Sequence, residues 1–172
     1  MLRFIDSVSE RFSQIATVLF FVIGLMISYE VVSRYVFLAP TSWAEEGARL
    51  LQLWATYLAM GFVLRHNGFI RITVLTEMIG PRARQVLEIF SLLWILVFSV
   101  FAFWLGIDVV MESIEKGRAT ATMNQVPKFW TESAIPVGFF VLILQALAQL
   151  WRQVRNPSDG EDPHERAIDL SI

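Results

Sequence analysis

The sequence predicts an all-α integral membrane protein with four transmembrane helices, and three observations support this prediction. Hydrophobic residues make up 55% of the 172 residues and charged residues only 17%, so both fractions differ from those of soluble domains. A soluble domain of this size could not bury so much apolar surface. Apolar stretches long enough to cross a bilayer recur along the chain without the alternation of a strand. The composition therefore excludes a soluble enzyme.

The four expected spans cover residues 15–37, 43–64, 86–107 and 131–151. The predicted organisation is an interfacial lead-in over 1–14, a four-helix membrane domain over 15–151 and a disordered cytoplasmic tail over 152–172. A signal peptide is the competing interpretation of the first stretch. Against it, Ser28, Tyr29 and Glu30 follow the apolar run where a small-residue cleavage site would be expected.

The distribution of Lys and Arg predicts that both termini face the cytoplasm. With this orientation the cytoplasmic side holds nine of these residues and the opposite side five. The segment 65–85 mixes apolar residues with arginines, so we expect it to lie along the inner membrane surface. Its basic residues are Arg65, Arg71, Arg82 and Arg84.

Charged residues within the membrane segments are the most informative ones, because each is costly in hydrocarbon. Glu30 and Arg34 stand four residues apart on the first helix, and Glu45 and Arg49 repeat this spacing on the second. A short turn between the helices would place Glu30 level with Arg49, and Arg34 level with Glu45. We expect these four residues to form a structural charge network that fixes the register of the hairpin.

Three alternatives to this network remain open. Residues 42–45 fit a capping box, in which Glu45 would satisfy backbone amides at the start of the second helix. Arg34 and Arg49 could instead extend to the lipid headgroups without a partner. A proton-relay role for Glu30 is disfavoured, because the neighbouring arginine favours the ionised carboxylate.

The pattern Pro-x-x-Trp-x-Glu occurs twice, at residues 40–45 and 127–132, each time where a helix enters from the outer side. Proline ends the loop, tryptophan suits the headgroup level, and glutamate suits the positive N-terminus of a helix. Common descent of two hairpins and convergence on good helix-entry chemistry are both compatible with this match. The expected helix-entry positions and possible partner surface are Pro40, Trp43, Glu46, Pro127, Trp130 and Glu132.

On the fourth span, Pro136 lies in the first turn, where a proline loses little hydrogen bonding. Gln145 and Gln149 are one turn apart and could bond to a helix of a partner protein. We expect no metal and no cofactor, because the chain has no cysteine and neither of its two histidines lies in an apolar run. The net charge of −2 without a long basic tract argues against a nucleic-acid partner.

Together these residues resemble the small permease subunit of tripartite ATP-independent periplasmic (TRAP) transporters. The resemblance covers about residues 19–151, and it rests on short motifs that contain charged residues, tryptophans and prolines. These motifs run from Glu30 to Phe37, then through Pro40, Trp43, Glu45, Glu46 and Arg49, Gly61 with Arg65, Gly68 to Ile72, Val126, Pro127 and Trp130, and Ile135 to Phe139. Family members often carry His at the position of Phe69 and Asp at that of Thr73.

The resemblance implies a non-catalytic subunit in the bacterial inner membrane, among membrane lipids. It would brace a large permease subunit that carries the substrate and sodium sites. A periplasmic solute-binding protein would deliver the substrate, commonly an organic acid. The alternative from the residues alone is a stand-alone four-helix exporter that uses Glu30 for proton exchange. An enzyme built on Glu45 and Glu46 is disfavoured, because adjacent residues of a helix diverge by about 100 degrees.

Overall fold

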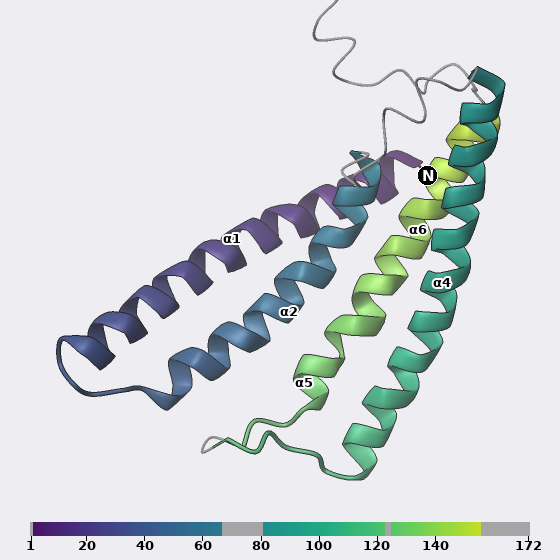
Figure 1. The fold of residues 1–172 in the computed structure, drawn as a ribbon. Coiled ribbons are helices and arrows are strands. Elements are labelled where there is room, and N and C mark those ends of the chain that lie inside the picture. The colour runs from purple at the N-terminus through teal and green to yellow at the C-terminus, as the bar shows by residue number, and fades with distance from the viewer. Residues whose placement is uncertain (1, 67–80, 123–124, 156–172) are drawn as a thin grey trace, which may run out of the picture.

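The computed structural model describes residues 2–66, 81–122 and 125–155. The described residues form the helices α1 (Leu2–Tyr35), α2 (Ser42–Arg65), α4 (Pro81–Glu115), α5 (Phe129–Glu132) and α6 (Ala134–Arg155), as Figure 1 shows. Four helical segments are long and apolar enough to cross a membrane: Ile5–Tyr35, Ser42–Arg65, Gln85–Glu115 and Phe129–Arg155. The prediction of an all-α protein with four membrane spans is therefore confirmed.

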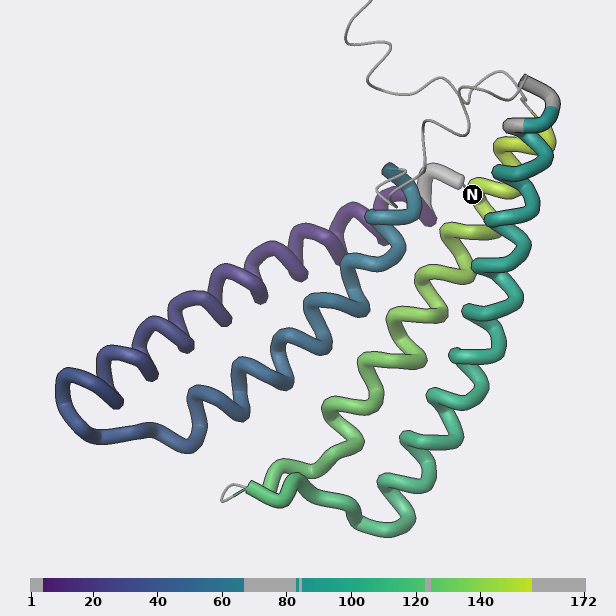
Figure 2. Tube along the Cα trace, viewed as in Figure 1, coloured from purple at the N-terminus to yellow at the C-terminus, as the bar shows by residue number. Residues whose placement is uncertain are grey.

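The four long helices form a single row rather than a square bundle. α2 packs against α1 on one side and against α6 on the other, and α4 packs on the far side of α6. α1 and α4 are therefore the edges of the row, and the two hairpins diverge away from the end that holds the N-terminus (Figure 2). A row one helix thick leaves both of its faces to the surroundings.

Two apolar clusters hold this row together. Ala16 of α1 packs with Ala55 and Leu58 of α2, and a larger cluster joins α2, α4 and α6. The members of the larger cluster are Leu64, Leu92, Phe139, Leu142 and Ala146. At Gly138 a Cβ would lie 2.8 Å from the backbone oxygen of Tyr57, so only glycine allows α6 to approach α2 this closely.

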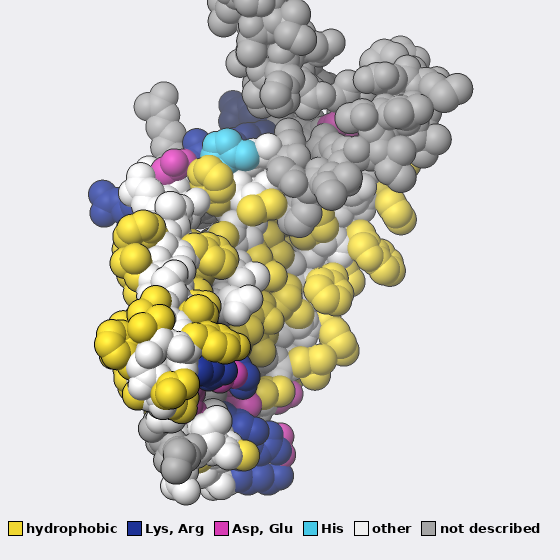
Figure 3. All heavy atoms as spheres, turned by 60° about the vertical axis from the view of Figure 1, so that its left-hand side comes forward, with side chains coloured by type: hydrophobic (Ala, Val, Ile, Leu, Met, Phe, Trp, Pro, Cys, Tyr) yellow, Lys and Arg dark blue, Asp and Glu magenta, His cyan; other side chains and the backbone are white. Residues whose placement is uncertain are grey.

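The outer surfaces of the edge helices are strongly apolar. Phe21 of α1 is 68% exposed, and Trp94 and Trp104 of α4 are 68% and 70% exposed. In Figure 3, hydrophobic side chains cover the middle of the molecule, whereas charged side chains gather toward its two ends. This distribution is the one expected of a chain whose middle lies in hydrocarbon.

The structure moves two of the expected boundaries. The predicted lead-in is continuous with the first span, since α1 begins at Leu2. The predicted tail begins four residues too early, because α6 continues to Arg155. Contacts hold this last turn: Arg152 pairs with Asp6 of α1, and Gln153 bonds to Glu88 of α4. Residues 156–172, and with them the rest of the expected tail, lie outside the described residues.

Candidate functional site

Polar contacts between helices gather at the two ends of the row. We call the group of Glu30, Arg34, Thr41, Glu45 and Arg49 the hairpin cluster, because it surrounds the connection between α1 and α2. We call the group of Asp6, Ser9, Glu10, Arg65, Gln145 and Arg152 the N-terminal cluster, because it lies at the opposite end of the row.

Glu30 is the centre of the hairpin cluster and is only 5% exposed. Its carboxylate accepts hydrogen bonds from Arg34 Nη2 at 2.8 Å and Nε at 3.1 Å. It also accepts bonds from the backbone N–H of Thr41 at 3.1 Å and from the Thr41 hydroxyl. Glu30, in the last turns of α1, therefore binds the residue that precedes α2.

The remaining charges extend this cluster onto α2. Arg34 lies 3.8 Å from a carboxylate oxygen of Glu45, and Glu45 pairs with Arg49. The structure thus brings the side chains of Arg34 and Glu45 together, as expected. Glu30 was expected opposite Arg49 but lies beside Thr41, the residue that precedes α2. Thr41 is eight residues before Arg49, which corresponds to about two helical turns. The four charged residues form consecutive ion pairs, but the register of α2 against α1 differs from the expected one.

The connector between the helices explains this register. Its residues 36–41 do not form a tight turn: the backbone reverses at Leu38, whose φ is 53°. The Ser33 hydroxyl then donates to the carbonyl of Ala39 at 2.6 Å. The connector consequently folds back along α1 and delivers Thr41 to Glu30.

The capping-box interpretation of residues 42–45 is wrong in its position. The residue that precedes α2 is Thr41, and it makes no side-chain bond to the helix amides. Its hydroxyl bonds to Glu30 instead. Of the two arginines that could extend freely to the headgroups, Arg34 is bonded to Glu30 and Arg49 to Glu45.

The second tryptophan motif and the loop before it contact α2 at this end of the row. Trp54 Nε1 donates to the carbonyl of Trp130 at 2.9 Å, which joins α2 to α5. Glu46 accepts a hydrogen bond from Thr120 Oγ1 at 2.6 Å and one from Thr122, which joins α2 to the α4–α5 loop. This loop closes through a bridge between Ala119 and Pro127.

The expected partner surface at the helix entries is therefore partly occupied by contacts within the chain. Trp43 and Trp130 stay 53% and 55% exposed, and Pro40 is exposed. Glu46 is used in the loop contacts just described. Within residues 2–66, 81–122 and 125–155, one oxygen of Glu132, Oε2, is buried without a hydrogen-bond partner.

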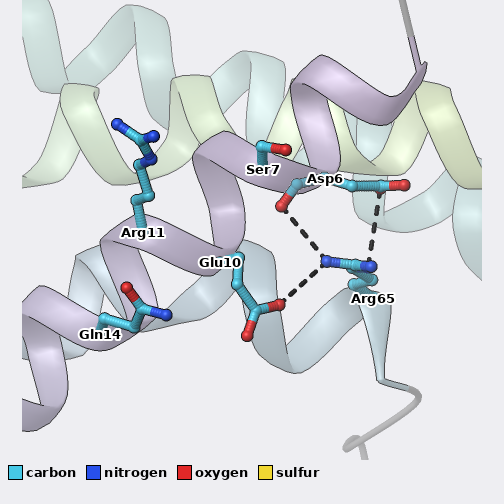
Figure 4. Close-up of a pocket in the computed structure, with 6 residues that line it drawn as sticks. All are labelled: Asp6, Ser7, Glu10, Arg11, Gln14 and Arg65. Atoms are coloured by element: carbon cyan, nitrogen blue, oxygen red, sulfur yellow. Dashed lines mark hydrogen bonds and ion pairs between the residues drawn. The ribbon is translucent and has the colours of Figure 1, made fainter.

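The N-terminal cluster joins three helices. Figure 4 shows Asp6 and Glu10 of α1 pointing toward Arg65 of α2, whereas Arg11 points away from it. Arg65 Nη1 donates to Glu10 at 3.1 Å, and Arg65 Nε lies 3.7 Å from Asp6. On its other oxygen Asp6 pairs with Arg152 of α6. One aspartate thus bonds to both neighbouring helices.

Two buried polar side chains extend this cluster into the row. Ser9 and Gln145 are both 0% exposed, and the Ser9 hydroxyl donates to Gln145 Oε1 at 3.1 Å. Gln145 Nε2 in turn donates to Asp6 at 3.4 Å. These bonds satisfy the glutamine inside the protein, where an unpaired amide would be costly.

This arrangement corrects the expectation that Gln145 contacts a partner helix, because the residue is buried between α1 and α6. Gln149 likewise bonds within the chain, donating to the carbonyl of Leu64 at 2.7 Å. Pro136 packs near Gly106 of α4, because a Cβ added at Gly106 would lie 3.3 Å from the Pro136 Cδ. All three side chains therefore contact neighbouring helices of the same chain.

The arginines of the expected inner-surface segment are only partly described. Arg65 belongs to the N-terminal cluster. Arg71 and most of the segment 65–85 lie outside the described residues, as do the side chains of Arg82 and Arg84. Sequence reasoning missed the N-terminal cluster, although Asp6 and Glu10 stand at the helical spacing of four near the start of the first helix.

In the part of the chain that the structure describes, no three His, Cys, Asp or Glu side chains are grouped so that they could hold a metal ion. The polar groups connect helices to each other and to loops. The fold and the clusters define a multi-pass α-helical membrane protein whose charges link its own helices.

Comparison with known proteins identifies the family. Residues 22–156 match the family described as "Tripartite ATP-independent periplasmic transporters, DctQ component". This match covers most of the chain, and the chain belongs to this family of transporter components, as the resemblance in the sequence indicated.

One relative is the "Isethionate TRAP transporter permease protein DctMQ" of Oleidesulfovibrio alaskensis. It is 22% identical over 136 residues, which cover 76% of this chain and 21% of the relative. The chain therefore spans about a fifth of the length of this relative.

Proposed function

We propose that this chain is the small, non-catalytic membrane subunit of a sodium-driven, binding-protein-dependent TRAP transporter that imports organic acids. In this function it braces a large permease subunit and carries no substrate site of its own. The observation that carries the proposal is the row of continuous helices linked by polar contacts at both ends, in a chain of the DctQ family.

The contacts at both ends of the row support a rigid scaffold. At one end Glu30 binds the start of α2, and Glu46 binds the α4–α5 loop. At the other end Asp6 bonds to both α2 and α6. Sliding of the α1–α2 hairpin along the α4–α6 hairpin would break the contacts of Glu46 with the loop and of Asp6 with Arg152, whereas a moving gate requires such sliding to be easy.

The partner is proposed to be a large permease subunit. The relative named DctMQ is much longer than the region matched by this chain, as expected where a small and a large component form one polypeptide. The name of this relative assigns isethionate to it, and isethionate is an organic anion. For this chain we propose only the class of organic acids, delivered by a periplasmic solute-binding protein.

The proposed orientation places both termini in the cytoplasm of a bacterial cell, with the chain in the inner membrane. The hairpin cluster and the exposed Trp43 and Trp130 then face the periplasmic side, where they could contribute to a docking surface for the binding protein. The N-terminal cluster lies at the cytoplasmic side.

A stand-alone exporter that uses Glu30 is not favoured. A proton-exchange carboxylate needs access to water and a readily changed charge. Glu30 is 5% exposed and bonds to Arg34 and Thr41, so its ionised form is held by its neighbours. These contacts support a structural role.

Reconstitution into liposomes tests the proposal. The chain alone, the large permease chain alone, and both together are each supplied with the binding protein, an organic acid and an inward sodium gradient. We expect uptake only when both chains are present. Uptake or proton-coupled efflux by the small chain alone would refute the proposal, and full activity of the large chain alone would refute the need for a brace.

A further inference from the structure

A row of polar side chains runs along the exposed side of α2 into the middle of the membrane. Glu45, Arg49, Gln52 and Thr56 are all exposed, and their spacing of four, three and four residues places them on one face of the helix. We call this face the α2 stripe. Its mid-membrane part takes no part in the hairpin cluster.

Gln52 lies at the centre of a helix that has the lowest mean hydropathy of the four candidate spans. The residue follows Ser42 by ten positions, about 15 Å along a helix of about 36 Å. A hydrocarbon layer of about 30 Å centred on this helix places the Gln52 amide near the bilayer midplane.

The amide of Gln52 differs from the exposed hydroxyl groups. Thr56 donates to the carbonyl of Gln52 at 2.8 Å, and Thr17 and Ser28 of α1 bond in the same way to their own helix. These hydroxyls are satisfied even in lipid. No described residue bonds to the Gln52 side-chain amide, and water does not reach the midplane to replace such a partner.

The edge helices show the opposite pattern on their outer sides. Phe21 of α1, with 68% exposure, and Val97 and Phe101 of α4, with 65% and 64%, suit contact with lipid chains. An exposed amide at the same depth suits contact with another protein, because polar side chains within membranes turn toward protein partners.

We propose that the α2 stripe is the surface on which the large permease subunit docks, through a membrane-spanning helix that presents an amide or hydroxyl group opposite Gln52. This inference rests on the proposed function, since it assigns the contact face of that partner. The charged part of the stripe, Glu45 and Arg49, extends the same face toward the connection between α1 and α2. The docking helix would therefore run along α2 from Thr56 toward Glu45.

Site-directed cross-linking tests the assignment, and the absence of cysteine from the chain makes every introduced thiol unique. The variants Gln52→Cys and Thr56→Cys are labelled with a photoactivated thiol reagent in membranes that also contain the large permease chain. Phe21→Cys and Val97→Cys are the matched controls, since both sites are exposed and lie within the spans. We expect several-fold more cross-linked large subunit at the stripe than at the controls, because only a thiol on the docking face lies within reach of the partner.

A substitution gives a second readout. Gln52→Leu is expected to lower the amount of large subunit that co-purifies by about five-fold, because one interhelical hydrogen bond is lost. The melting temperature of the small chain alone should not fall, since leucine suits lipid. Thr17→Val on α1 is the control and should change neither quantity.

The outcomes separate the two claims. Stronger cross-linking from Phe21→Cys or Val97→Cys to the large chain would overturn the docking face and leave the proposed function intact. Cross-linking of Gln52→Cys to a second copy of this chain would also overturn it. A failure of the wild-type chain to co-purify with the large permease chain would instead refute the proposed function.

Discussion

The close approach of α6 to α2 at Gly138 leads to a sharp prediction. In Gly138→Ala the new methyl group would lie 2.6 Å from Tyr57 Cβ and 2.8 Å from the Tyr57 backbone oxygen. Neither atom can move away by a change of side-chain rotamer. The two helices must therefore separate by about 0.8 Å to restore ordinary contact at 3.4 Å with the Tyr57 Cβ.

The expected magnitude combines two opposing terms. Overpacking costs about 1–3 kcal/mol, and the gain from alanine over glycine within a helix is about 0.5–1 kcal/mol. We expect a net loss of about 1–2 kcal/mol in the free energy of unfolding. The separation would also loosen the only broad contact between the two hairpins in the described part of the chain.

Unfolding of the detergent-purified chain by titration with a denaturing detergent measures this loss. Gly24→Ala on α1 is the matched control, because a Cβ at Gly24 meets nothing within 4 Å. The control should be as stable as the wild type or more stable. Equal stability of Gly138→Ala and Gly24→Ala would refute the reasoning from close packing.

Three further predictions concern the clusters and the connector. Asp6→Asn should lower the free energy of unfolding by about 2 kcal/mol in the same titration, because two arginines lose a shared charged partner. Arg34→Glu should destabilise the chain, and Glu45→Arg should rescue it only partly, with a coupling below about 1 kcal/mol, because the pair is half exposed and Glu30 then faces a second carboxylate. Leu38→Gly should stabilise the chain by about 1 kcal/mol, because glycine adopts a φ of 53° without strain.

Each of these has its own contrary result. A stable Asp6→Asn would mean that the arginines find other partners. Full rescue in the double variant would show that Glu30 does not contribute to binding Arg34, and a less stable Leu38→Gly would show that the exposed leucine makes a favourable contact.

The four membrane spans could be predicted from the sequence, because apolar length is a local property. The pairs Glu30–Arg34 and Glu45–Arg49 follow in the same way from a spacing of four residues on a helix. The meeting of Arg34 with Glu45 was predicted from an assumed tight turn, and it occurs in the observed register because the long arginine side chain reaches Glu45.

The register of that hairpin could not be predicted, because it depends on the backbone path through Leu38 in the connector. The N-terminal cluster was missed for a related reason. Asp6 and Arg152 are 146 residues apart, and their meeting depends on the order of helices in the row. The burial of Gln145 could not be predicted either, because its partners Ser9 and Asp6 lie more than 130 residues away in the sequence.

The edge helices are much longer than the helices between them, with 34 residues in α1 and 35 in α4 against 24 in α2 and 22 in α6. At about 50 Å each, they exceed the thickness of the hydrocarbon by some 20 Å. This surplus is accommodated by tilt of the helices or by helix ends that extend beyond the hydrocarbon. Asp6 lies near the N-terminal end of α1 and pairs with Arg65 of α2 and Arg152 of α6, so a displacement of this helix end would act on three helices together.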